Sequence, residues 1–257
     1  MQRRTQRLRY GPRRGQHVIV RAASDSRREA TIVLIHGGFW KWPYSRRVFA
    51  LVERHGARVG FDMVNVEYRR LGRFGGGGGW PSTFEDINAA IRLAKQRHPD
   101  QGLYVVGHSA GGHLALVAAA SNSDIIDGVV AIAAPTDLRA LFETGSDVVT
   151  DLVRGAPVDS RWKLTSPVDM VPIGVPVVCV HSDTDSTVAP SNSVRFIEAA
   201  TAAGDDAELA IVTAERHRDA MLSRSRTWTR ALAAVCEWSG VSTDDSSGDC
   251  DLTKGPS

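Results

Sequence analysis

Apolar residues occur along this chain in two patterns, short continuous runs and longer stretches with helical spacing. The short runs are rich in Val, Ile and Ala. This is typical of strands buried on both faces, because a strand with one wet face would alternate apolar and polar residues. We expect strands at residues 17–21, 30–35, 61–68, 103–106, 128–134, 175–180 and 207–213.

Between these runs, apolar residues recur every three to four positions, which predicts amphipathic helices. We expect helices at residues 44–55, 83–97, 113–120, 191–203 and 220–238. A repeated order of strand and helix is typical of an α/β fold, in which helices cover both faces of a mostly parallel central sheet. Ligands of such sheets bind at the carboxyl ends of the strands.

Three segments depart from this alternation. In residues 138–174, glycine and proline break the apolar pattern into short fragments, so we expect a small cap over the carboxyl edge of the sheet. Residues 1–9 are rich in arginine and residues 240–257 are polar, and both ends are predicted to be disordered. This leaves a single domain over residues 10–239, while the arginines are compatible with a basic arm, a transit peptide or a solvated leader.

Composition and charge exclude several classes of protein. The chain has 257 residues, of which 42% are hydrophobic, and a formal net charge of +2. It can therefore bury a full core, and its charge gives no reason to expect a nucleic-acid or membrane partner. No apolar run is long enough to span a bilayer, and no apolar stretch of the kind found in signal peptides follows the arginines, so we expect no secretory signal. We expect a cytoplasmic protein, and a homodimer is left open.

The cysteines give no sign of a disulfide framework or a zinc site. Cys179, Cys236 and Cys250 are widely spaced, without the close pairing that either arrangement needs. Cys179 lies in a strand-like run and Cys236 in a helical pattern, so we expect both side chains to be buried as small hydrophobes.

The clearest chemical signal is a G-x-S-x-G motif at residues 107–111, with Ser109 at its centre. The motif lies between a predicted strand and a predicted helix, the context of a nucleophile elbow. Glycines permit a turn sharp enough to present the serine hydroxyl at the top of the sheet. The start of the following helix also offers free N–H groups, including that of Ala110, to a negatively charged oxygen.

A second glycine pair, Gly37-Gly38, follows the strand at residues 30–35. Backbone N–H groups that stabilise an oxyanion must approach the substrate closely, and glycines allow that approach. We therefore expect the oxyanion hole from Gly37, Gly38, Phe39 and Ala110. The alternative is a plain strand-ending turn.

A serine hydroxyl is a weak nucleophile, so it needs a histidine to take its proton and a carboxylate to orient that histidine. In enzymes that carry the serine on a nucleophile elbow, these groups follow in the order Ser, acid, His. His217 is then the candidate base, because His181 precedes the best acid. Asp185 is the candidate acid and Asp183 the alternative. A metal site at His181, Asp183 and Asp185 is the rival interpretation, with no further ligand pattern to support it.

These motifs resemble those of the α/β-hydrolase superfamily. The segment His36-Gly37-Gly38-Phe39-Trp40, the elbow that continues to Ala115, and the acid loop before His217 look most like the kynurenine formamidase (arylformamidase) and carboxylesterase branch. The resemblance extends from about residue 10 to residue 238. It implies a serine hydrolase that needs no metal or cofactor and acts on a small-molecule ester or amide.

We therefore expect an enzyme that cleaves a small-acyl ester or an aryl formamide through an acyl-enzyme. Phe39, Trp40 and Trp80 are candidate substrate-binding residues, because aromatic rings stack on planar substrates, although core packing explains each equally well. Two rivals remain: a non-catalytic binding protein on the same fold, which would have no need of a complete triad, and nucleic-acid binding through the arginine leader.

Overall fold

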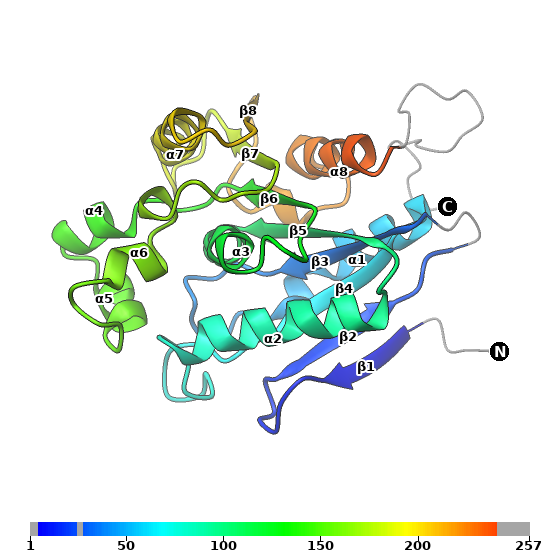
Figure 1. The fold of residues 1–257 in the computed structure, drawn as a ribbon, viewed down its shortest axis with the longest axis horizontal. Coiled ribbons are helices and arrows are strands. Elements are labelled where there is room, and N and C mark those ends of the chain that lie inside the picture. Colours follow the sequence, from blue (N-terminus) through cyan, green and yellow to red (C-terminus); the bar gives the residue numbers. More distant parts are fainter. Residues whose placement is uncertain (1–4, 25–27, 241–257) are drawn as a thin grey trace.

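The computed structural model describes residues 5–24 and 28–240. An eight-stranded sheet in the order β1-β2-β4-β3-β5-β6-β7-β8 runs through the molecule (Figure 1). From β4 to β8 neighbouring strands are parallel, and β1 and β2 add an antiparallel edge. The strands are β1 (Thr5–Arg9), β2 (His17–Arg21), β3 (Ala30–Ile35), β4 (Asp62–Glu67), β5 (Gly102–His108), β6 (Gly128–Ile132), β7 (Val177–Ser182) and β8 (Ala207–Val212).

Helices cover both faces of this sheet, as the alternation of runs predicts (Figure 1). One face carries α2 (Ser82–Arg97), α3 (Ala110–Ser121) and α7 (Ser191–Ala202), and the other carries α1 (Ala50–Val59) and α8 (Arg226–Trp238). Short helices complete the chain: η1 (Arg46–Phe49), α4 (Leu138–Glu143), α5 (Asp147–Val153), α6 (Arg161–Thr165), η2 (Pro167–Asp169) and η3 (Asp219–Met221). Those between residues 138 and 169 make up the predicted cap region.

Strand β3 shows why the central runs are continuously apolar. All its residues are buried. Val33 and Ile35 pack into the core beneath α2 and α3, whereas Ile32 and Leu34 pack into the core beneath α8. Successive side chains of a strand point to opposite faces, so a strand between two helix layers must be apolar at every position.

Several sequence predictions need correction. The leader predicted to be disordered contains strand β1, whose burial alternates between exposed and half-buried positions. The predicted helix at residues 44–55 is divided into η1 and α1, and the last helix begins at Arg226 rather than near residue 220. Residues 1–4 and, apart from Gly240, the predicted polar tail at 240–257 lie outside the described residues.

No helix in the described part of the chain combines the length and the apolar character that a membrane span needs.

Cys179 and Cys236 are buried, as predicted. Burial raises the pKa of the Cys179 thiol to about 12.

Candidate active site

Ser109 occupies a sharp turn between β5 and α3. Its backbone has φ 54° and ψ −122°, a conformation that side chains disfavour. The turn is held by the N–H of Ser109, which donates to the carbonyl oxygen of Ile132 in β6 at 2.7 Å. A Cβ on Gly107 would lie 2.1 Å from the carbonyl oxygen of Gly111, and one on Gly111 would lie 2.0 Å from that of Ile35. The elbow glycines are therefore required by close backbone packing.

A second strained turn lies beside the elbow, after β3, and we call residues 37–41 the oxyanion loop. Gly38 has φ 113°, and a Cβ there would lie 2.2 Å from the Cβ of Tyr44. Phe39 and Trp40 also have positive φ, and the N–H of Lys41 closes the turn on the Gly38 oxygen at 2.9 Å.

This turn leaves backbone donors free. Within the part of the chain that the structure describes, no hydrogen bond takes the N–H of Gly38, Phe39 or Ala110. The carbonyl oxygen of His108 and the Cβ of Ser109 would lie 2.7 and 3.0 Å from a Cβ on Gly37, so the two turns are in contact. Free N–H groups beside a serine are suited to binding a negatively charged substrate oxygen.

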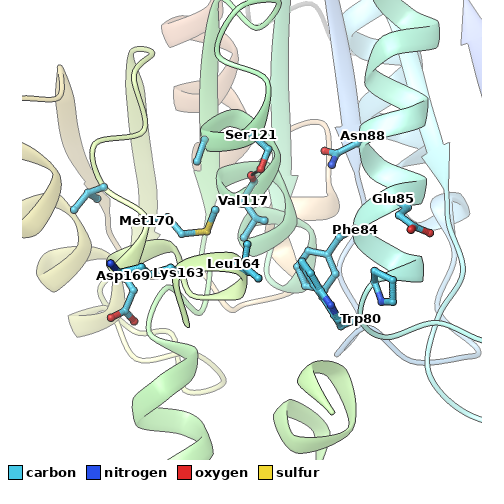
Figure 2. Close-up of a pocket in the computed structure, with 13 residues that line it drawn as sticks. Trp80, Phe84, Glu85, Asn88, Val117, Ser121, Lys163, Leu164, Asp169 and Met170 are labelled. Atoms are coloured by element: carbon cyan, nitrogen blue, oxygen red, sulfur yellow. Dashed lines mark hydrogen bonds between the residues drawn. The ribbon is translucent and has the colours of Figure 1, made fainter. Parts of the chain in front are cut away.

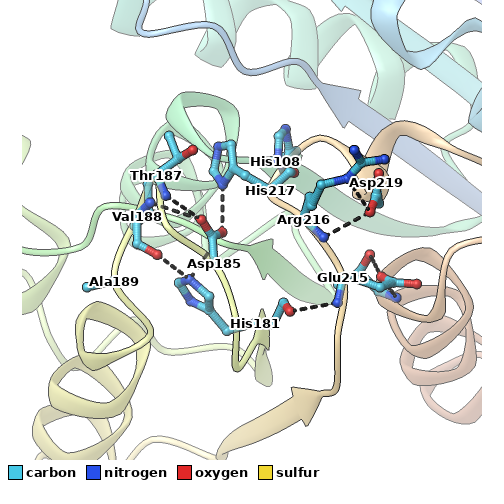
Figure 3. A network of polar contacts seen from close by, with 12 residues as sticks. His108, His181, Asp185, Thr187, Val188, Ala189, Glu215, Arg216, His217 and Asp219 are labelled. Carbon is cyan, nitrogen blue, oxygen red and sulfur yellow. Dashed lines mark hydrogen bonds and ion pairs between the residues drawn. The ribbon is translucent and has the colours of Figure 1, made fainter.

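Asp185 and His217 are brought together by the loops after β7 and β8. His217 Nδ1 lies 2.7 Å from Asp185 Oδ2 (Figure 3), so this nitrogen carries the proton and donates it to the carboxylate. The other oxygen, Oδ1, accepts the N–H groups of Thr187 and Val188 at 2.8 and 3.1 Å. Burial alone would raise the pKa of Asp185, but the nearby His181 ring and the hydrogen bonds from His217 and these two backbone groups outweigh it and hold the pKa well below its ordinary value.

The alternative acid and base have other hydrogen-bond partners. Asp183 Oδ1 accepts the N–H of Ala214 at 2.9 Å, and Asp183 is not paired with His217. His181 is fully buried, with Nδ1 2.8 Å from Ser193 Oγ and Nε2 2.9 Å from the Val188 oxygen. Its contact with Asp185 is longer, at 3.6 Å. Among residues 5–24 and 28–240, no group of three or more His, Cys, Asp or Glu is arranged to hold a metal ion.

The loop that carries His217, residues 214–219, is held by polar contacts that the sequence analysis did not identify. We call it the histidine loop. Glu215 accepts hydrogen bonds at the start of α8, from the Arg226 N–H at 2.5 Å and from the Thr227 N–H at 3.1 Å. Asp219 accepts the Arg216 N–H at 2.9 Å (Figure 3). Glu215 precedes the first residue of α8 by eleven positions, so no local capping pattern in the sequence indicates this contact.

His108, directly before the nucleophile candidate, joins the histidine loop to the elbow. Its Nε2 donates to the carbonyl oxygen of His217 at 2.8 Å, and the two rings lie 4.6 Å apart between centroids. Burial, and then the nearby charge of His217, lower the pKa of His108 to about 3, so its ring is neutral at ordinary pH. The elbow therefore positions the histidine loop as well as Ser109.

A cavity of about 320 Å³ surrounds Ser109 and His217. Most of its surface is apolar, and it opens to solvent. The lining residues are Gly37, Gly38, Phe39, Tyr44, Val48, His108, Ser109, Thr187, His217, Arg218 and Met221.

The three aromatic residues predicted to bind substrate do not form one wall. Phe39 lines the Ser109 cavity, but Trp40 is 3% exposed and packs in the core, where its Nε1–H donates to His113 Nδ1 at 3.2 Å. Trp80 lies against Phe84 in a separate cavity of about 680 Å³ between α2, α3 and α6 (Figure 2). Trp40 is thus a packing residue of the oxyanion loop, and Trp80 lines a cavity apart from Ser109.

Solved structures with the same architecture include esterases and related hydrolases. A truncated carbohydrate esterase from gut microbiota superposes with a TM-score of 0.77 at 18% identity, covering 93% of this chain and 99% of its own. An acetyl ester-xyloside bifunctional hydrolase from Caldicellulosiruptor lactoaceticus gives 0.74 at 21% identity, covering 93% and 98%. A butyrate-bound esterase from Thermogutta terrifontis gives 0.73 at 20% identity, covering 95% and 97%. The predicted α/β-hydrolase fold is confirmed.

A family model matches a large part of the sequence itself. The match covers residues 81–240, which is more than half of the 257 residues. It includes the elbow and the loops that carry Asp185 and His217, but not the oxyanion loop. By this match the chain belongs to the prolyl oligopeptidase family.

Proposed function

We propose that this protein is a serine hydrolase that cleaves esters of short acyl groups, with Ser109 as nucleophile, His217 as base and Asp185 as orienting acid. The observation that carries the proposal is the 2.7 Å contact between His217 Nδ1 and Asp185 Oδ2, made by a histidine that lines the same cavity as Ser109. This contact leaves Nε2 of the neutral ring without a proton, which is the state that a general base needs.

The first half of the reaction forms an acyl-enzyme. Ser109 Oγ attacks the carbonyl carbon while His217 Nε2 takes its proton, and the carbonyl oxygen becomes an anion that receives hydrogen bonds from the free N–H groups of Gly38, Phe39 and Ala110. The bond to the leaving group then breaks, and His217 gives its proton to the departing alcohol. Asp185 stays ionised and stabilises the protonated imidazole.

The second half returns the enzyme to its starting state. Water attacks the acyl carbon, its proton passes to His217 Nε2, and the second tetrahedral intermediate uses the same N–H groups. The bond to Ser109 Oγ breaks, Oγ regains the proton, and the carboxylic acid leaves. Apart from Ala110 and Asp185, the residues used in these steps line the Ser109 cavity.

The volume of the cavity and the solved structures of similar fold both favour a short acyl group. The cavity, of about 320 Å³, is small for a site that would also have to accommodate a long alkyl chain. Among similar structures, one is described as an acetyl ester-xyloside hydrolase, and an esterase from Thermogutta terrifontis is described with propionate and with butyrate bound. An aryl formamide is the second candidate, because formyl is the smallest acyl group and the rings of Phe39 and Tyr44 line the cavity.

The test combines active-site labelling with a substrate panel. Ser109→Ala should abolish labelling by a fluorophosphonate probe and lower kcat by about 10⁴-fold or more, since the nucleophile is removed. The matched control is Ser121→Ala at the exposed end of α3, which should leave both the probe labelling and kcat at their wild-type levels. Unchanged turnover in Ser109→Ala would overturn the proposal.

The panel consists of 4-nitrophenyl esters of increasing acyl length, together with N-formylkynurenine. We expect kcat/KM to fall for acyl chains of about eight carbons or more, because methylenes without a pocket add no transition-state binding. Hydrolysis of N-formylkynurenine at a comparable rate would favour the formamidase assignment, whereas hydrolysis of the short esters alone would favour a carboxylesterase. A maximum at the longest esters would contradict the small-acyl pocket.

A further inference from the structure

The Ser109 cavity has an unusual distribution of charge. Besides Ser109, Thr187 and the two histidines, its walls are made of glycines and of aromatic, aliphatic and methionine side chains, and Arg218 is the only Arg, Lys, Asp or Glu among the lining residues. Arg218 directly follows His217 on the histidine loop and is exposed to solvent. A fixed positive charge therefore lies at the mouth of a cavity whose surface is mostly apolar.

No carboxylate neutralises this charge in the part of the chain that the structure describes. Arg218 has no ion pair within 4.0 Å there, whereas its neighbour Arg216 contacts Asp219 at 3.5 Å. The acids of the adjoining loop have other partners: Asp185 is bonded to His217, and Asp183 accepts the Ala214 N–H. The guanidinium of Arg218 is thus available to a ligand that enters the cavity.

The position of Arg218 indicates which part of a substrate it would meet. In the proposed reaction His217 gives its proton to the leaving group, so the leaving group must lie against the histidine loop. Arg218 belongs to that loop, whereas the oxyanion loop binds the carbonyl oxygen from another strand end. A guanidinium has a planar pair of donors that matches a carboxylate.

We propose that the physiological substrate carries a carboxylate on its leaving group, and that Arg218 binds this carboxylate. The proposal rests on the serine hydrolase function given above and narrows its substrate class to anionic alcohols or amines that bear a small acyl group. Arg218 is then a specificity-determining residue: it contributes binding energy to the anionic substrate and takes no part in proton transfer.

The test uses two acetyl esters, 4-acetoxybenzoate, whose leaving group is anionic, and its methyl ester, whose leaving group is neutral. Their kcat/KM values are measured for the wild type and for Arg218→Gln. For each protein, kcat/KM for the anionic ester is divided by kcat/KM for the neutral ester. Comparing this ratio between the two proteins cancels differences in the intrinsic reactivity of the esters. We expect the ratio to fall about five- to tenfold in Arg218→Gln, the size of a partly exposed charge-assisted contact.

Two controls separate a direct contact between Arg218 and the carboxylate from a general electrostatic effect of the histidine loop. Arg216→Gln removes the same charge from the same loop, outside the cavity lining, and should leave the ratio near the wild-type value. Added salt should lower the ratio in the wild type and have little effect in Arg218→Gln, because salt screens exposed charges. A thermal melt of each variant verifies that the fold is intact.

The outcomes separate this proposal from the function on which it rests. If neither ester is hydrolysed, the proposed function fails. If the neutral ester is hydrolysed and the ratio is equal in wild type and Arg218→Gln, the anionic substrate class is wrong. A fall of equal size in Arg216→Gln would also overturn the specific role of Arg218. If 4-nitrophenyl hydrogen glutarate, with its carboxylate on the acyl side, loses more rate in Arg218→Gln than 4-acetoxybenzoate does, the assignment to the leaving group is wrong.

Discussion

The elbow and the histidine loop both present a residue to the Ser109 cavity, but they are held in different ways. At the elbow, backbone packs directly on backbone, and Gly107 and Gly111 leave no space for a methyl group. The histidine loop is half-exposed, and side-chain carboxylates bind its N–H groups and anchor it to α8. The nucleophile candidate therefore depends on steric fit, whereas the base candidate depends on polar contacts.

This difference indicates how each region responds to change. A close-packed turn has no small adjustment available, so any added atom forces strands and helices apart. A loop held by several hydrogen bonds can lose one and keep its fold, with a less exact position for His217. Substitutions at the elbow should thus affect stability, and substitutions in the histidine loop should affect catalysis.

The largest expected effect comes from adding one methyl group at the elbow. Gly111→Ala would place a Cβ 2.0 Å from the carbonyl oxygen of Ile35, and we expect a loss of about 4 kcal/mol in the free energy of unfolding. Gly15→Ala is the matched control, because its Cβ would meet its nearest neighbour at an ordinary 3.5 Å and should change stability by less than about 1 kcal/mol. Urea unfolding measures both, and equal stability of the two variants would refute the steric account.

A decrease in pH is expected to have an effect of intermediate size on the free energy of unfolding. Burial is the main cause that lowers the pKa of His108 to about 3 and that of His113 to about 4, from an ordinary value of 6.5. Below pH 6.5 the unfolded chain binds protons that the folded protein does not. The stability of the folded state is therefore complete above that pH and falls as the pH decreases.

Each of these two histidines contributes up to about 1.4 kcal/mol per pH unit, so the free energy of unfolding should decrease by about 3 kcal/mol between pH 6.5 and 5. Burial also lowers the pKa of His17 and His55, which act in the same direction. Because the pKa of Asp185 lies well below its ordinary value, its contact with His217 should persist through this range. Urea unfolding at each pH tests this, and a flat profile would contradict it.

The smallest change in stability is expected in the histidine loop. Glu215→Gln leaves one oxygen to accept the bonds that two now share at the start of α8, and it removes a negative charge from the helix N-terminus. We expect a loss of about 1–2 kcal/mol in stability and a fall in kcat that exceeds the change in KM. Glu208→Gln, at an exposed pair with Arg230, is the matched control and should cost less than about 1 kcal/mol. If Glu215→Gln raises KM and leaves kcat unchanged, the loop does not act through His217.

The sequence predicted most of the sheet because its central strands are buried on both faces and therefore appear as continuous apolar runs. It failed at β1, whose arginines at positions 7 and 9 resemble a solvated leader. On an edge strand such as β1, one face remains exposed to solvent. Charged residues there also protect the edge from pairing with a strand of another molecule. Local composition cannot distinguish this case from a disordered arm.

The candidate triad followed from chain order, and the contact of Asp185 with His217 agrees with it, although the catalytic roles stay predictions. The aromatic residues were harder to assign. Phe39 and Trp40 are adjacent, yet one lines the cavity and the other is buried against His113. Their directions depend on positive backbone φ values in the oxyanion loop, which no periodicity reveals. Trp80 joins a different cavity because the cap packs beside it.

The positions of the site residues along the chain have a consequence for folding. Gly38 follows β3, Ser109 follows β5, Asp185 follows β7 and His217 follows β8, the last strand in the described part of the chain. Contacts between segments so far apart form only after long loops have closed, which makes them late and slow events. During refolding, the recovery of hydrolysis should therefore lag behind the recovery of helical circular dichroism, so that enzyme activity reports the final docking of β8 and α8 rather than the collapse of the core.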